Sequence, residues 1–144
     1  MKIYLDHCCY NRPFDDQSGI LIRIETEAKL FVQSEIGAGR IDLVWSSVND
    51  FENNDNPFPG KSERIAVWRG IAREIVKTSG GILTKALELE KIGLKPKDAL
   101  HVASAIAARC DFFLTTDKGI LNKQGMGIRA INPVSFVEHY LNEK

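Results

Sequence analysis

The stretch KPKDALHVASAIAARCDFFLTTDKGIL, residues 95–121, decides the fold. Residues 98–109 are rich in alanine, which has the best intrinsic helix propensity, so they predict a helix. The apolar run at residues 112–114 is typical of a buried strand, and Asp117 follows it after two threonines. A helix that leads into a buried strand is the repeating unit of α/β folds with a parallel sheet.

The same alternation extends along the rest of the chain. Further strands are predicted from apolar runs at residues 2–6, 41–45 and 127–131. Further helices are predicted at residues 20 to about 36, from Ser46 or Ser47 through Glu52, and at residues 62–77, 83–92 and 134–141. Strands separated by helices predict an α/β fold, with a parallel sheet covered on both faces, in a single domain over residues 1–144.

The amino-acid composition is typical of a globular protein. Hydrophobic residues make up 44% and charged residues 26% of the chain, which is ordinary for a globular domain. No apolar run is long enough to span a membrane and no signal peptide begins the chain, so we expect a soluble cytoplasmic protein. Equal numbers of basic and acidic residues, 19 of each, remove the simplest argument for nucleic-acid binding without excluding it. Three cysteines, an odd number, argue against a disulfide framework.

Four acidic residues stand at the edges of the predicted elements. Asp6 closes the first strand, Glu52 follows the second, Asp98 begins the alanine-rich helix, and Asp117 follows the next strand. Because parallel strands end at one edge of their sheet, we expect these carboxylates to converge there. Converging carboxylates repel one another unless a divalent cation lies between them, and oxygen ligands suit Mg²⁺ or Mn²⁺ better than zinc. The pattern therefore predicts a metal-dependent site of the kind that hydrolyses phosphodiesters.

Each acid also has an ordinary structural interpretation. Asp98 would suit the first turn of any helix, where a carboxylate complements the helix dipole. Asp117 would suit a turn with the residues that follow it. Asp6, at the end of a buried strand, needs a partner, and a salt bridge to Lys118 or Arg12 would supply one.

Four segments of the chain together resemble the PIN-domain family: KIYLD, SSVNDFE, the stretch quoted above and the closing IRAINPVSFVEHY. The most diagnostic part is an Asp, an alanine-rich helix, an apolar strand and Thr-x-Asp, here Asp98 through Thr115-Thr116-Asp117. The resemblance covers essentially the whole chain in the right order. It implies a three-layer α/β/α sandwich around a parallel sheet, and a Mg²⁺- or Mn²⁺-dependent ribonuclease. Many bacterial members are the toxins of VapBC toxin–antitoxin pairs, which implies an RNA substrate, an antitoxin partner and a homodimer.

The resemblance also assigns roles to single residues. Asp6, Glu52, Asp98 and Asp117 match the acidic quartet that holds one or two metal ions, and Thr115 matches the active-site hydroxyl. Basic residues around the expected rim are candidates to hold the phosphate backbone, or else ordinary surface charges: Arg12, Lys95, Lys97 and Lys118.

The chain departs from the family pattern at several positions. His7, Cys8 and Cys9 follow Asp6, where smaller or hydroxylic residues are common. His101 lies one turn after Asp98, and we interpret it as a hydrogen-bonding residue of the core or of the site's surroundings rather than as a metal ligand. Two acids on the first long helix compete with Glu52 for its role, although their positions favour exposure to solvent or pairing with Arg23 and Lys29: Glu25 and Glu27.

Two other functions stay open at this point. A catalytically inactive PIN-like module would bind nucleic acid or protein without cleaving it. A receiver or phosphatase-like domain would use an Asp at a strand end beside a Lys, as Asp117 and Lys118 are in sequence. An apolar stripe on the helix predicted at 62–77 favours a core face over a partner or dimer surface: Ile65, Trp68, Ile71 and Ala72.

Overall fold

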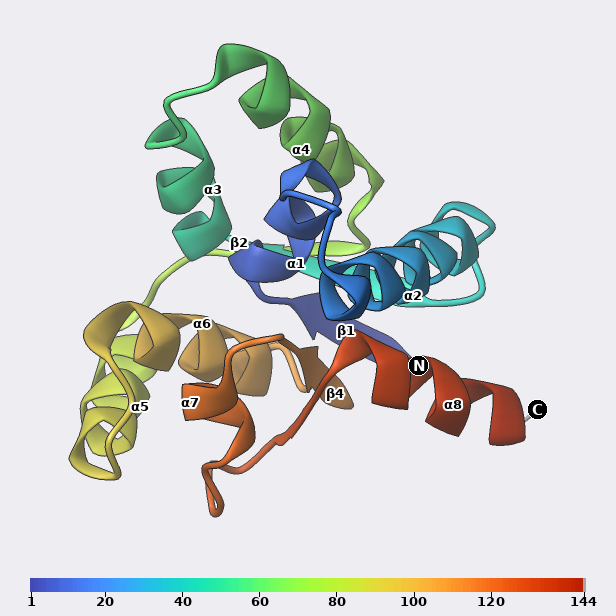
Figure 1. Ribbon diagram of the computed structural model, residues 1–144. Helices are drawn as coiled ribbons and strands as arrows, with labels where there is room; N and C mark the ends of the chain where they lie inside the picture. The colour runs from blue at the N-terminus through green and yellow to red at the C-terminus, as the bar shows by residue number, and fades with distance from the viewer. Residues whose placement is uncertain (144) are drawn as a thin grey trace.

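A five-stranded sheet forms the centre of the computed structural model, which describes residues 1–143 (Figure 1). All neighbouring strands are parallel, in the order β3-β2-β1-β4-β5. The strands are β1 (Lys2–Leu5), β2 (Asp42–Ser46), β3 (Glu74–Val76), β4 (Phe112–Leu114) and β5 (Arg129–Ile131). The predicted α/β fold with a central parallel sheet is confirmed.

Side chains of the central strands alternate between two cores, one on each face of the sheet. Ile3 and Leu5 pack into one core, while Tyr4 packs into the other. The neighbouring strand β4 alternates in the same way, so Phe113 stacks on Tyr4 with ring centroids 5.3 Å apart. A strand that is buried on both faces has to be apolar at every position, which explains the uninterrupted runs that predicted these strands.

Helices cover both faces and make the three-layer arrangement (Figure 1). On one side lie α1 (His7–Asn11), the short 3-10 helix η1 (Arg12–Phe14), α2 (Ile20–Gly37), α4 (Pro59–Ile71) and α8 (Pro133–Asn142). On the other side lie α5 (Gly80–Lys91), α6 (Pro96–Ala107) and α7 (Lys118–Leu121). Helix α3 (Ser47–Asn54) follows β2 directly, with Ser46 as its N-cap in a capping box. Within residues 1–143, no helix is both long and apolar enough to cross a membrane.

The helix predicted at residues 62–77 is wrong in its second half. Helix α4 ends at Ile71, because Ala72 adopts an extended backbone and the Arg73 N–H donates to the carbonyl of Leu43 on β2 (2.8 Å). Residues 74–76 then form the edge strand β3, where the β-branched Ile75 and Val76 suit the pleat. The apolar stripe is mainly a core face, since three of its four residues pack into the core and only Ile71 is exposed: Ile65, Trp68 and Ala72.

Replacing Phe113 by alanine should destabilise the protein by about 3–5 kcal/mol, because it removes a fully buried ring from between β4 and α6. Phe51 is the matched control, since its side chain is 64% exposed. The Phe51→Ala variant should unfold within about 0.5 kcal/mol of the wild type. Urea titrations followed by circular dichroism measure both values, and equal losses would contradict this account of the core.

Candidate active site

The predicted acids lie around the carboxyl ends of β2, β1 and β4. The chain adds β2 on one side of β1 and β4 on the other, so the strand order reverses at β1. In open α/β sheets ligands bind at such a switch point, beyond the carboxyl ends of the strands. Asp6 and Thr115 directly follow β1 and β4, and the Asp6 N–H donates to the carbonyl of Leu114 (2.9 Å).

Asp6 is buried, with 5% of its surface exposed. Its Oδ2 accepts a hydrogen bond from the Thr115 hydroxyl (2.7 Å), and its Oδ1 accepts the His7 backbone N–H at the start of α1 (2.8 Å). In residues 1–143 it forms no ion pair, so the alternative of a salt bridge to Lys118 or Arg12 is wrong. Burial, together with the charges of Cys8 and Asp98, raises the pKa of Asp6 to about 8, against the lowering effects of His101 and of the Thr115 hydrogen bond.

Asp98 and Asp117 line one cavity of about 310 Å³, together with Lys95 and Lys123. Asp98 lies in the first turn of α6, where burial and the charge of Asp117 raise its pKa. Asp117 is the N-cap of α7 and accepts the Gly119 N–H through Oδ1 (2.7 Å), so the turn expected from Asp117 and the residues that follow it is confirmed. Its backbone N–H donates to the Thr115 hydroxyl oxygen (3.0 Å).

Glu52 is held by a buried chain of hydrogen bonds. Its Oε1 is bonded to Nε2 of His101, which is fully buried on α6. The other ring nitrogen of His101 is bonded to the Tyr4 hydroxyl (2.5 Å), which in turn bonds the hydroxyl of Ser46 (2.5 Å). Burial raises the pKa of Glu52, but the hydrogen bond and charge of His101 lower it by more. His101 therefore has the hydrogen-bonding role expected of it, through a network that the sequence did not predict.

Glu52 faces a different cavity from Asp98 and Asp117. This second cavity, also about 310 Å³, is lined by Glu52 together with His7, Asn11, Phe58 and Lys61. The structure therefore brings Asp6 to Thr115 and Asp98 to Asp117, while Glu52 is turned toward His101. The charge of Glu52 still raises the pKa of Asp98, so the two carboxylates are within electrostatic range.

The competing acids on α2 have other partners. Glu25 is buried, and it pairs with Arg12 (3.4 Å) and accepts a hydrogen bond from Asn132 (2.7 Å), so both expectations for it, exposure to solvent and pairing with Arg23 or Lys29, are wrong. Glu27 is exposed. Arg12 is also bonded to Asp15 and to the Thr116 hydroxyl, and it is thus a structural link rather than a free rim charge.

Cys8 is a neighbour of the site that the sequence did not identify. Its thiol lies 3.5 Å from Asp6 Oδ2 and 3.5 Å from the Thr115 hydroxyl, and the Thr116 hydroxyl lies 3.3 Å from its sulfur. Hydrogen bonding from Cys9 is the largest of the effects that lower the pKa of Cys8 to about 6. The sequence contained a signal for this position, because Cys8 lies only two residues after Asp6 and therefore stays close to the end of β1.

The donor chemistry of this edge fits a hard divalent cation. All four acids offer oxygen, the ligand that Mg²⁺ and Mn²⁺ prefer. The charge of Asp98 raises the pKa of Asp6, and the charges of Asp117 and Glu52 raise the pKa of Asp98. A cation between them would relieve that repulsion. The side chains are not yet gathered around one point, since in residues 1–143 no group of three or more His, Cys, Asp or Glu is arranged to hold a metal ion. The site as folded is an acidic edge rather than a closed metal cage.

Comparison with known proteins rests on structure. No family model matches the sequence, and no curated protein matches it. A chain of the crystal structure of FitAcB from Neisseria gonorrhoeae superimposes with a TM-score of 0.63 at 13% identity, covering 91% of this chain and 97% of that one. The fold is PIN-like. A chain of the crystal structure of VapBC2 from Rickettsia felis, bound to a DNA fragment from their promoter, is similar as well, with a TM-score of 0.59 at 15% identity and coverage of 92% and 98%.

Replacing Asp6 by asparagine should change how stability depends on pH. The folded protein holds a proton on Asp6 up to a pKa of about 8, whereas the unfolded chain loses it near pH 4. The folded state thus binds more protons between these values, and the free energy of unfolding falls as the pH rises through that window. Because asparagine does not ionise, the Asp6→Asn variant does not lose this stability. The difference in free energy of unfolding between variant and wild type should therefore shift in favour of the variant from pH 5 to pH 9. Urea titrations in EDTA at both pH values measure the difference, which would stay constant if Asp6 ionised normally.

Proposed function

We propose that this protein is a metal-dependent endoribonuclease and the toxin of a toxin–antitoxin pair. The observation that carries the proposal is the buried Asp6 carboxyl group, fixed by Thr115 at the switch point of a PIN-like sheet and within electrostatic range of Asp98. Burying a carboxyl group without a counter-charge costs stability, so the position of Asp6 favours a functional role.

Asp6, Asp98 and Asp117, with Glu52, would hold Mg²⁺ or Mn²⁺. Such an ion favours the attack of water on phosphorus and stabilises the departing oxygen. Thr115 keeps Asp6 in place from β4 and also accepts the Asp117 N–H, so one hydroxyl orients two of the acids. Asp6 has to release its proton before it can bind a cation, and His101 keeps Glu52 ionised by lowering its pKa.

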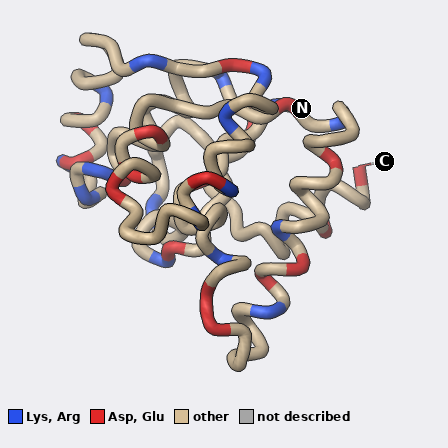
Figure 2. Tube along the Cα trace, turned by 90° about the horizontal axis from the view of Figure 1, so that it is seen from above, with Lys and Arg blue, Asp and Glu red and all other residues tan. Residues whose placement is uncertain are grey.

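An RNA phosphodiester suits the surroundings of these acids. Lys95 and Lys123 line the same cavity as Asp98 and Asp117, and they offer ammonium groups to a phosphate. Elsewhere basic and acidic positions are interspersed along the trace (Figure 2). The affinity for RNA would then come from the local site rather than from the net charge, which is zero.

The toxin assignment rests on the PIN-like fold and on the resemblance of the sequence to VapC-type proteins. The similar structure of VapBC2 contains both members of such a pair, according to its name. An antitoxin that covers the acidic edge, and a homodimer of this chain, belong to the same proposal. The second candidate is a PIN-like binding module without catalysis, which is favoured by the bond between Glu52 and His101 and by the open arrangement of the acids.

Replacing Asp98 or Asp117 by asparagine should reduce RNA cleavage in Mg²⁺ or Mn²⁺ to background, because each variant removes a charged ligand. Asp111→Asn is the matched control. Asp111 precedes β4 and therefore lies at the opposite edge of the sheet, where it accepts the Lys2 N–H (2.8 Å). Cleavage of a tRNA panel gives the activity, and calorimetric titration with Mn²⁺ gives binding independently of activity.

Three results separate the candidates. Loss of both Mn²⁺ binding and cleavage in the Asp98 and Asp117 variants, with a normal Asp111 variant, supports the nuclease. Wild-type protein that binds RNA but neither binds Mn²⁺ nor cleaves would favour the binding module. Full cleavage by the Asp117→Asn variant would overturn the site.

A further inference from the structure

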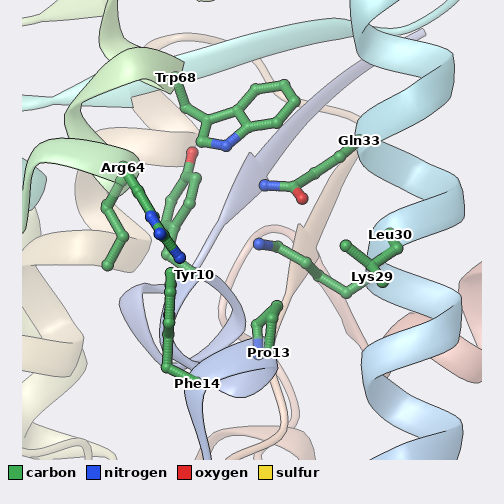
Figure 3. A pocket seen from close by; sticks show the side chains of 9 residues that line it. Tyr10, Pro13, Phe14, Lys29, Leu30, Gln33, Arg64 and Trp68 are labelled. Atoms are coloured by element: carbon green, nitrogen blue, oxygen red, sulfur yellow. The ribbon is translucent and has the colours of Figure 1, made fainter. Parts of the chain in front are cut away.

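A cavity of about 150 Å³ lies between α1, η1, α2 and α4, away from the acidic edge (Figure 3). In Figure 3, side chains from α2 point across this space toward α1, and residues of α4 close its other side. The residues that line it include Tyr10, Phe14, Lys29, Gln33, Arg64 and Trp68.

Lys29 brings an uncompensated positive charge to this cavity. Its side chain comes from the buried face of α2, and only 3% of the residue is exposed. In residues 1–143 no carboxylate lies within ion-pair distance of it, and its ammonium lies over the face of the Tyr10 ring, 5.4 Å from the ring centroid. Buried charges are normally paired, because a buried charge loses its hydration and only a partner of opposite charge compensates for that loss. Burial lowers the pKa of Lys29 to about 8, which leaves it cationic at neutral pH.

Tyr10 adds an unsatisfied polar group to the same space. The residue is 1% exposed, and its hydroxyl has no hydrogen-bond partner in the described chain. Most buried polar groups are hydrogen-bonded, so an exception of this kind calls for an explanation. In Figure 3 the Gln33 amide and the Lys29 ammonium both point toward Tyr10, with Trp68 above. A cation, a hydroxyl donor and an amide donor thus meet at one cavity.

The lining offers the Gln33 amide oxygen as an acceptor but no carboxylate to balance the charge of Lys29. No acidic residue lines the cavity, and Arg64 contributes a second cation at its rim. We infer that this cavity binds a small carboxylate, which would accept hydrogen bonds from Lys29 and Tyr10 while its apolar body packs on Trp68 and Phe14.

Size and charge favour a carboxylate over other anions. An apolar cavity of about 150 Å³ holds a molecule the size of benzene, whereas ligand pockets for larger molecules are about 300–1,000 Å³. A nucleotide is therefore too large. One buried ammonium matches a single negative charge, and the walls of Phe14, Leu30, Ile65 and Trp68 suit an apolar ligand body better than a hydrated phosphate. The site is separate from the proposed ribonuclease activity, because none of the four acids lines it.

Benzoate and its neutral isostere benzamide test the inference. Titrations of the full chain, followed by calorimetry and by tryptophan fluorescence, should show saturable binding of benzoate and at least tenfold weaker binding of benzamide. Lys29→Met should weaken benzoate binding by about a hundredfold, and Tyr10→Phe by about tenfold, since each removes a hydrogen bond to a charged group. Lys91→Met on the exposed surface of α5 is the matched control and should bind as the wild type does.

A pair of peptides distinguishes the source of the carboxylate. If acetyl-Leu-Glu-Leu-amide displaces benzoate and its glutamine analogue does not, the natural ligand is an acidic side chain. If neither displaces it, the ligand is a free acid, and both results support a carboxylate site. Equal affinity for benzoate and benzamide, displacement by inorganic phosphate at lower concentration, or no binding of any probe would overturn it. Tyr10→Phe loses one oxygen only, so it remains a valid test if Lys29→Met fails to fold.

Discussion

The hydrogen bond from the Thr115 hydroxyl to Asp6 joins the ends of two parallel strands at the point where the strand order reverses. The same hydroxyl accepts the Asp117 N–H, so the position of three residues depends on the register of β1 against β4. That register pairs Leu5 with Leu114. A slip of one residue would turn every β4 side chain to the opposite face, moving the Phe113 ring out of its core and Thr115 away from Asp6. The packing of the two cores therefore sets the geometry of the acidic edge.

The sequence predicted those parts of the site that follow from strand ends. Asp6 and Thr115 directly follow apolar strands and Asp117 comes two residues later, so parallel pairing of β1 with β4 places them at the same edge of the sheet. Glu52 was predicted on a helix after the second strand, and α3 confirms that placement. Its bond to His101 was not predicted, because it spans 49 residues and depends on how α3 packs against α6. The edge strand β3 was missed because its three residues continue the helical spacing of α4, and pairing with β2 decides their conformation. Long-range contacts override local pattern in both cases.

Helix α2 shows the same override on a larger scale. Its buried positions include charged and amide side chains, while several of its large apolar residues are exposed, among them Ile20, Leu21 and Ile24. Two of the buried acids have specific partners: Glu25 bonds Arg12 and Asn132, and Glu35 bonds Arg40 and Tyr140. Such pairs fix the orientation of the helix through directional hydrogen bonds rather than through the apolar area that it buries. An amphipathic pattern read from sequence cannot reveal that choice, because it assumes that apolar residues face inward.

The distance along the chain between Asp6 and Thr115 also bears on how the protein is made. The two residues are separated by 109 positions, although their side chains touch. At ribosomal rates of about 5–20 residues per second, β1 waits roughly 5–20 seconds for β4 to be synthesised. During that interval the first strand lacks one of its two neighbours, and the Asp6 carboxylate stands in water without its threonine. A nascent chain therefore stays unable to assemble this edge until β4 has left the ribosome.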